Sequence, residues 1–130
     1  MSDRRLPAFL VVTLLAAALV SPAQADPTAQ LIEVYKRSML SWSIDYDTLR
    51  PNRAGAACIP WESLDDAFLE EGIFEALGYA WQVAGEPVAA RAAMEGCERM
   101  RRGHQLVKIC TCELLLYNDE VRLILPETPE

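Results

Sequence analysis

Four cysteines are the residues of this chain whose type and spacing best suit chemistry: Cys58, Cys97, Cys110 and Cys112. One residue separates Cys110 from Cys112, so their side chains point the same way in an extended segment. Two such thiolates could bind a soft metal such as Cu(I), with Met100 or His104 as further ligands. They could also take part in thiol–disulfide exchange if nearby positive charge lowers a thiol pKa. The chain has no Cys-x-x-Cys motif and no histidine-rich tract, which weakens the metal hypothesis.

The fate of these thiols depends on the compartment, and residues 1–25 resemble a secretory signal peptide. Two arginines near the start precede the apolar run Leu6–Val20, which leads to an Ala-x-Ala cleavage pattern at 23–25. An uncleaved membrane anchor fits less well, because a spanning helix needs roughly 20 apolar residues. We therefore expect cleavage before Asp26, location in a bacterial periplasm or the medium, and no membrane span in the exported chain.

In an oxidising compartment, an even number of cysteines in a small domain indicates a disulfide framework. A bond between Cys110 and Cys112 is the least favoured, because Cα atoms two residues apart in a strand lie about 6.5–7 Å apart. We expect one of these two to pair with Cys97 and the other with Cys58. Closing the short loop from Cys97 should stabilise the fold by roughly 3 kcal/mol. In a reducing cytosol, the two neighbouring thiols would instead be the leading functional candidates.

Charge and length limit the class of protein further. The net charge of −7 argues against non-specific nucleic-acid binding, which needs basic stripes that displace phosphate counterions. The same charge is compatible with a basic partner. Residues 26–125 are expected to form a single small domain, with 126–130 as a polar C-terminal tail.

Two long helices are predicted from apolar spacing and end signals. Asp26 and the following proline form a helix start, and apolar residues then recur at intervals of three and four to about Ser41. Beyond that point, the pattern fits either more helix or a strand. The second helix starts at Pro87, places Ala89, Ala93, Cys97 and Met100 on one face and is expected to end at the glycine at position 103.

The remaining segments predict loops, a short helix and strands. Residues 51–60 are typical of a loop, and a weak capping box at Ser63 predicts a short helix to Glu71. Residues 73–83 fit either a buried strand or a helix, and 107–125 predict a β-hairpin. We therefore expect an α+β fold in which N-terminal helices precede a strand–helix–hairpin unit joined by disulfides. A mainly helical fold is the alternative if 73–83 is helical.

Three motifs follow one another in this part of the chain: Gly78-Tyr79-Ala80-Trp81, an alanine-rich helix that ends Gly96-Cys97-Glu98, and Cys112-Glu113-Leu114-Leu115-Leu116-Tyr117. Over about residues 74–125 they resemble small exported bacterial domains of unknown function. The resemblance implies a strand–helix–strand unit with a helix-to-strand disulfide, and it transfers no catalytic residue. The chain departs from that pattern in the long connection 101–108 and in its doubled cysteine, so the partner of Cys97 stays open.

The other candidate residues have ordinary explanations. His104 is the single histidine and is expected in a solvated loop. The acidic pairs could serve a glycosidase or a calcium site, but solvated helix faces explain them. A strip of three aromatic residues fits the core face of a helix better than a site that stacks on a ligand. A run of four basic residues fits the C-terminal end of a helix, where positive charge complements the helix dipole. The acidic pairs are Asp45 and Asp47, Asp65 and Asp66, and Glu70 and Glu71; the strip is Tyr35, Trp42 and Tyr46; the basic run is Arg99, Arg101, Arg102 and Lys108.

The chain contains no Gly-x-Ser-x-Gly, His-Glu-x-x-His or phosphate-loop motif. We therefore predict a non-enzymatic periplasmic accessory or binding protein without a cofactor, whose partner is a protein or a small ligand. The alternative is a periplasmic copper-type metal protein or thiol-redox protein that uses Cys110 and Cys112. A small hydrolase would need a carboxyl group of raised pKa in a cleft.

Overall fold

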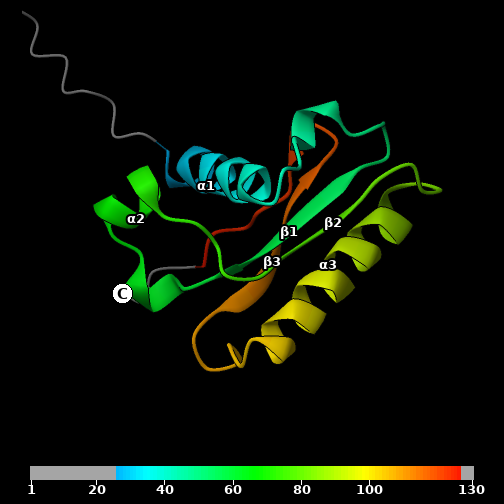
Figure 1. Ribbon diagram of the computed structural model, residues 1–130. Helices are drawn as coiled ribbons and strands as arrows, with labels where there is room; N and C mark the ends of the chain where they lie inside the picture. Colours follow the sequence, from blue (N-terminus) through cyan, green and yellow to red (C-terminus); the bar gives the residue numbers. More distant parts are fainter. Residues whose placement is uncertain (1–25, 127–130) are drawn as a thin grey trace, which may run out of the picture.

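A four-stranded antiparallel sheet lies between two long helices, α1 on one face and α3 on the other (Figure 1). The computed structural model describes residues 26–126, so the predicted signal peptide and the last four residues of the predicted tail lie outside it. The strand order is β2-β1-β3-β4. The elements, with 3₁₀ helices written η, are α1 (Pro27–Ser41), η1 (Tyr46–Thr48), β1 (Ala54–Ile59), η2 (Trp61–Ser63), α2 (Asp66–Glu71), β2 (Leu77–Ala80), α3 (Glu86–Gly103), β3 (Thr111–Tyr117) and β4 (Glu120–Val121).

Helix α1 begins and ends where the sequence predicts. The Asp26 carboxylate accepts a hydrogen bond of 3.0 Å from the backbone N–H of Thr28, and the helix ends at Ser41. The chain then turns and forms only the short η1. Neither the longer helix nor the strand considered for residues 42–49 is present, because the segment folds back toward the sheet and buries Tyr46.

The prediction of a loop at residues 51–60 is wrong. Ala54–Ile59 forms β1, which lies between β2 and β3 and is buried along its whole length. Its sequence, Ala-Gly-Ala-Ala-Cys-Ile, contains mostly residues with a weak intrinsic preference for strands. The strand forms because it is hydrogen-bonded on both edges and packed on both faces. As a result, β1 precedes α2, and the order of elements differs from the predicted one.

The open choice for residues 73–83 is settled by β2, so the α+β fold is confirmed and the mainly helical alternative is wrong. The short helix α2 is confirmed, although its N-cap is Asp65 rather than Ser63. The Asp65 carboxylate accepts a hydrogen bond of 2.8 Å from the N–H of Phe68. Helix α3 is also confirmed, with Ala89, Ala93 and Cys97 buried. Within residues 26–126, no helix has the length and apolar character needed to cross a membrane.

The predicted hairpin is present but shorter than 107–125. Strand β3 starts at Thr111, and β4 contains only two residues. A register shift opposite Gly55 and Ala56 inserts one extra residue into β3. This bulge explains why the neighbours Leu115 and Leu116 both face the core under α1, since side chains otherwise alternate along a strand.

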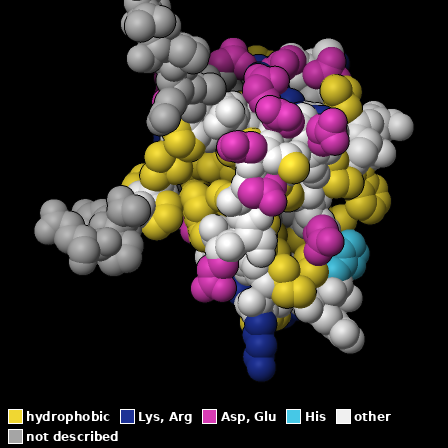
Figure 2. Space-filling model, turned by 90° about the vertical axis from the view of Figure 1, so that its left-hand side faces the viewer, with side chains coloured by type: hydrophobic (Ala, Val, Ile, Leu, Met, Phe, Trp, Pro, Cys, Tyr) yellow, Lys and Arg dark blue, Asp and Glu magenta, His cyan; other side chains and the backbone are white. Residues whose placement is uncertain are grey.

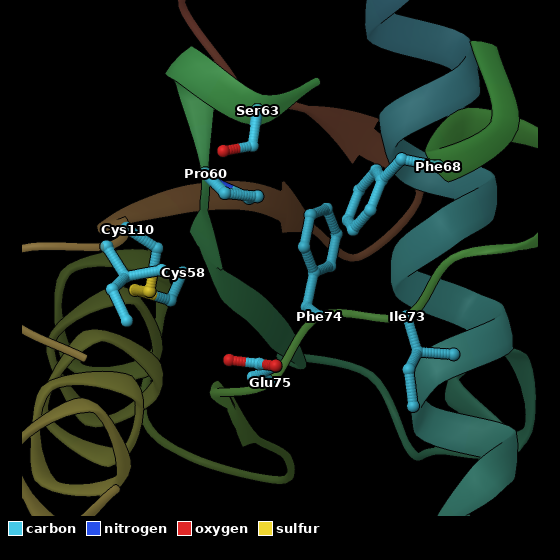
Figure 3. A pocket seen from close by; sticks show the side chains of 9 residues that line it. Cys58, Pro60, Ser63, Phe68, Ile73, Phe74, Glu75 and Cys110 are labelled. Atoms are coloured by element: carbon cyan, nitrogen blue, oxygen red, sulfur yellow. A yellow bond between two sulfur atoms is a disulfide. The ribbon is translucent and has the colours of Figure 1, made fainter. Parts of the chain in front are cut away.

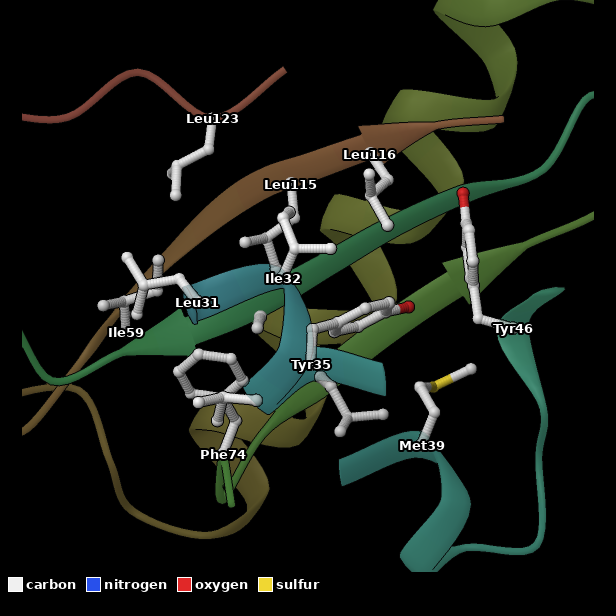
Figure 4. Close-up of a cluster of buried hydrophobic side chains, with 13 residues drawn as sticks. Leu31, Ile32, Tyr35, Met39, Tyr46, Ile59, Phe74, Leu115, Leu116 and Leu123 are labelled. Atoms are coloured by element: carbon white, nitrogen blue, oxygen red, sulfur yellow. The ribbon is translucent and has the colours of Figure 1, made fainter. Parts of the chain in front are cut away.

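The two faces of the sheet carry different cores. Under α1, large side chains pack together (Figure 4). Under α3, the buried residues are mainly alanine and cysteine. Gly78 of β2 allows this close approach, because a Cβ atom there would overlap the carbonyl oxygen of Ala93 and lie 2.5 Å from the backbone nitrogen of Cys97. The large residues labelled in Figure 4 are Leu31, Ile32, Tyr35, Met39, Tyr46, Ile59, Phe74, Leu115, Leu116 and Leu123.

A candidate binding pocket beside a disulfide

All four cysteines form disulfides, Cys58 with Cys110 and Cys97 with Cys112. The Cα atoms of the two pairs lie 5.1 and 6.0 Å apart. The expectation that Cys110 and Cys112 take different partners is confirmed, and the structure assigns those partners. Both residues belong to the core under α3, where β1 supplies one partner and the helix supplies the other.

The alternative hypothesis, a metal or redox site at Cys110 and Cys112, needs free thiolates, and both sulfurs are bonded in disulfides in this structure. Its two further candidate ligands also have other contacts. The sulfur of Met100 accepts a hydrogen bond of 3.3 Å from the backbone N–H of Leu77, and Nδ1 of His104 lies 3.1 Å from the carbonyl oxygen of Glu75. Among the residues described, no three His, Cys, Asp or Glu side chains are grouped so that they could hold a metal ion.

A pocket of about 210 Å³ opens beside the Cys58–Cys110 disulfide. The rings of Phe68 and Phe74 lie on one side, with their centroids 5.6 Å apart, and the disulfide lies on the other (Figure 3). The polar side chains in the wall are those of Ser63 and Glu75. The remaining lining residues are Pro60, Ile73 and Ile109.

Two arginines hold the rims of this pocket. From α1, Arg37 donates hydrogen bonds to the carbonyl oxygens of Gly72 at 2.8 and 3.0 Å and of Leu69 at 3.3 Å, which fixes the C-terminal end of α2. From α3, Arg101 donates to the carbonyl oxygens of Cys110 at 2.7 Å and Val107 at 2.6 Å. The pocket is therefore bounded by segments whose backbones are fixed by hydrogen bonds and by one covalent bond.

A second hollow of about 160 Å³ adjoins the first, and the two share Ile109 and Cys110. Trp61, Glu62 and Lys108 contribute to its wall. Ile109 lines both hollows and is 57% exposed, so an elongated ligand that occupies both could contact it.

The other predicted site residues are distributed over the molecule. The six paired acids and His104 are exposed, as expected for solvated residues. The aromatic strip is divided: Tyr35 and Tyr46 are core residues, whereas Trp42 is 55% exposed. Of the basic run, Arg101 is not a solvated helix-end residue, because it holds the loop before β3.

Burial raises the pKa of both core tyrosines. The hydroxyl of Tyr35 donates a hydrogen bond of 3.0 Å to the carbonyl oxygen of Gly78, and burial is the main reason why its pKa lies well above the usual value. Burial raises the pKa of Tyr46 to about 12, against an opposing effect of the Arg53 guanidinium. Both hydroxyls therefore stay neutral over the physiological range and are part of the structure.

The pocket could not be predicted from the sequence, because its walls come from β1, η2, α2, the segment before β2 and the loop before β3. One signal was present. Residues 54–90 contain seven acidic residues and neither lysine nor arginine, and the pocket lies along this run.

These features define a small α+β protein with two disulfides and an apolar pocket beside one of them. Comparison with protein-family models, curated proteins and solved structures gives no match for the chain.

Proposed function

We propose that this chain is an exported, non-enzymatic binding protein that takes an apolar group of its ligand into the pocket beside Cys58–Cys110. The pocket itself is the observation that carries the proposal. Two phenylalanine rings and the side chains of Ile73 and Ile109 surround about 210 Å³ of space. A dry cavity of about 150 Å³ accommodates benzene, so one aromatic or branched aliphatic group is the appropriate size. Apolar walls with few polar groups are typical of ligand sites.

The hydrogen-bonded rims support the proposal that the pocket is a binding site. A site whose walls are held before the ligand arrives loses less conformational entropy on binding. Arg37, Arg101 and the disulfide each hold a different wall segment. The one carboxylate and one hydroxyl in the wall, Glu75 and Ser63, can orient a ligand.

Two observations support export. Residues 1–25 have the pattern of a signal peptide, and two disulfides are typical of proteins in oxidising compartments. Mass spectrometry of the N-terminus of the exported protein is expected to find Asp26. A count of free thiols in denatured, non-reduced protein is expected to give none, whereas two persistent thiols would favour the thiol-redox alternative.

Nuclear magnetic resonance with a neutral aromatic probe tests the pocket. Titration of the purified, disulfide-bonded protein with indole is expected to shift the methyl signals of Ile73 and Ile109. The variant Ser63→Trp fills the pocket from the last residue of η2 and should abolish these shifts. Thr48→Trp is the matched control, because Thr48 is also exposed and ends the other short 3₁₀ helix. Unchanged signals in the unaltered protein would contradict the proposal.

A further inference from the structure

We infer that the ligand is a cationic segment of another polypeptide, which places one apolar side chain in the pocket and Lys or Arg side chains against the surrounding acids. The inference rests on the proposed function and adds the chemical class of the partner. Its support is the charge around the pocket and the shape of the two adjoining hollows.

The charge around the pocket is negative and not compensated. Six acidic residues lie between positions 62 and 75, and all of them are exposed. None of the six forms an ion pair with any residue in the range 26–126. On this side of the molecule, acidic side chains lie among apolar ones (Figure 2). The six are Glu62, Asp65, Asp66, Glu70, Glu71 and Glu75.

Several acids elsewhere have basic partners within the chain. Asp47 lies 3.1 Å from Lys36, and Asp119 lies 2.6 Å from Arg53. Glu86 and Glu120 both pair with Arg122, and the hydrogen bond from that guanidinium lowers the pKa of Glu86. A basic partner would supply to the pocket side the countercharge that these acids obtain internally. Complementary charge of this kind favours encounter and selects the partner.

Basic groups near the pocket do not neutralise this surface. The guanidinium of Arg37 is held against the carbonyl oxygens at the end of α2, and that of Arg101 pairs with Glu98 at 3.2 Å. His104 contacts the backbone of Glu75 rather than a carboxylate. Lys108 lines the second hollow together with Glu62, but the two form no ion pair.

The arrangement of the two hollows favours an extended ligand. They adjoin at Ile109 and Cys110, and each has one carboxylate in its lining, Glu75 in the first and Glu62 in the second. Side chains alternate along an extended peptide, so an apolar residue can enter the pocket while basic neighbours reach the acids. A negative surface opposes both anionic lipid headgroups and nucleic acid.

Selection from a phage-displayed library of random dodecapeptides against the purified, disulfide-bonded protein tests the inference. The expected peptides carry Lys or Arg on both sides of Phe, Leu, Ile or Met. A synthetic copy of the most enriched peptide should bind less tightly in Glu62→Gln/Glu75→Gln by at least about tenfold, equivalent to about 1.4 kcal/mol. Its affinity should also fall as the salt concentration rises.

A second double variant provides the control at equal net charge. Glu95→Gln/Glu120→Gln removes two exposed acids, one on α3 and one near the Tyr117 end of β3, away from Ile109. Its affinity for the same peptide should remain within about twofold, or about 0.4 kcal/mol. Equal losses in both variants would show a general charge effect and overturn the inference.

The remaining outcomes separate this inference from the proposed function. If selection yields no peptides, or peptides without excess Lys or Arg, while indole still binds, the inference fails and the binding function stands. If indole also fails to bind, the proposed function fails. Binding to phosphatidylcholine or phosphatidylglycerol vesicles that is lost in the pocket-filling variant Ser63→Trp would assign the surface to lipid instead.

Discussion

The two faces of the sheet are stabilised in different ways. Under α1, leucine, isoleucine, tyrosine, methionine and phenylalanine side chains fill the space, and burial of each contributes roughly 1.5–3 kcal/mol. Under α3, alanines bury little area; one disulfide joins α3 to β3, and the other joins β1 to the loop that follows α3. A thin layer of small residues can therefore hold a helix when backbones approach closely and covalent bonds supplement the packing.

Glycines in the neighbouring strands β1 and β2 make both arrangements possible. A Cβ atom at Gly55 of β1 would lie 2.5 Å from the ring of Tyr35, so this strand leaves room for a large side chain under α1. Gly78 of β2 instead leaves room for the backbone of α3. Tyr35 connects the two arrangements, because its hydroxyl binds the carbonyl oxygen of Gly78.

The largest expected effect is that of Gly78→Ala, which should break the close approach under α3. The new methyl group would overlap the backbone of α3, and we expect a loss of at least about 4 kcal/mol in the free energy of unfolding, measured by urea denaturation. Gly96→Ala is the control. Its Cβ would lie 3.4 Å from the Cα of Gly78, so the change should be neutral or stabilise by up to about 1 kcal/mol. A stable Gly78→Ala protein would show that α3 can move away from the sheet.

Removal of each disulfide measures how much that covalent bond contributes to the stability of the core under α3. The paired changes Cys58→Ala/Cys110→Ala open a loop of 52 residues and should cost about 4 kcal/mol. The pair Cys97→Ala/Cys112→Ala opens a loop of 15 residues and should cost about 3 kcal/mol. Urea denaturation gives both values, and indole titration should show weaker binding only for the first pair. Equal indole affinities would mean that the disulfide does not maintain the pocket.

Ser38→Ala tests the polar contact that joins α1 to the segment before β2. The Ser38 hydroxyl oxygen is buried and accepts a hydrogen bond of 2.8 Å from the N–H of Phe74. Its removal leaves that N–H without a partner, so stability should fall by about 2 kcal/mol. Ser41→Ala on the same helix removes only a bond to the Ser38 carbonyl oxygen and should change stability by less than about 0.5 kcal/mol. Similar values for the two variants in thermal or urea denaturation would disprove this role of Ser38.

The smallest expected effect is an alkaline loss of stability that originates under α1. The pKa of Tyr46 is raised from 10 to about 12 in the folded state, so the folded form resists deprotonation. Stability from this group is complete below pH 10 and is lost as the pH rises toward 12, by at most about 1.4 kcal/mol per pH unit. Between pH 9 and 11, Tyr46→Phe should lose about 1 kcal/mol less than the unaltered protein in urea denaturation. Parallel pH profiles would contradict the shift.

Much of the helical structure could be predicted because its signals are local. The N-cap Asp26, the apolar interval in α1 and the alanine face of α3 each specify a helix within a few residues. Strand β1 could not be predicted in this way. Its alanines and glycine have weak strand preference, and it is a strand because β2 and β3 lie on either side of it.

The candidate site, too, could be predicted from the sequence only in part. The even number of cysteines and their spacing predicted the alternatives for disulfide pairing, but the choice between Cys110 and Cys112 for Cys97 required the position of α3 over β3. The pocket combines Phe68 and Phe74 with Ile109, which lies 35 residues further along the chain and shares no motif with them. Only the folded chain brings them together.

The sequence by itself determined the long helices, the disulfide framework and the negative charge, because these depend on local spacing, composition and cysteine count. Tertiary structure decided the central strand, the disulfide partners and the pocket, because each depends on contacts between distant segments. Gly78 illustrates the difference. In the sequence it is a small residue in an ambiguous segment, and in the fold it is the point at which the backbones of β2 and α3 meet.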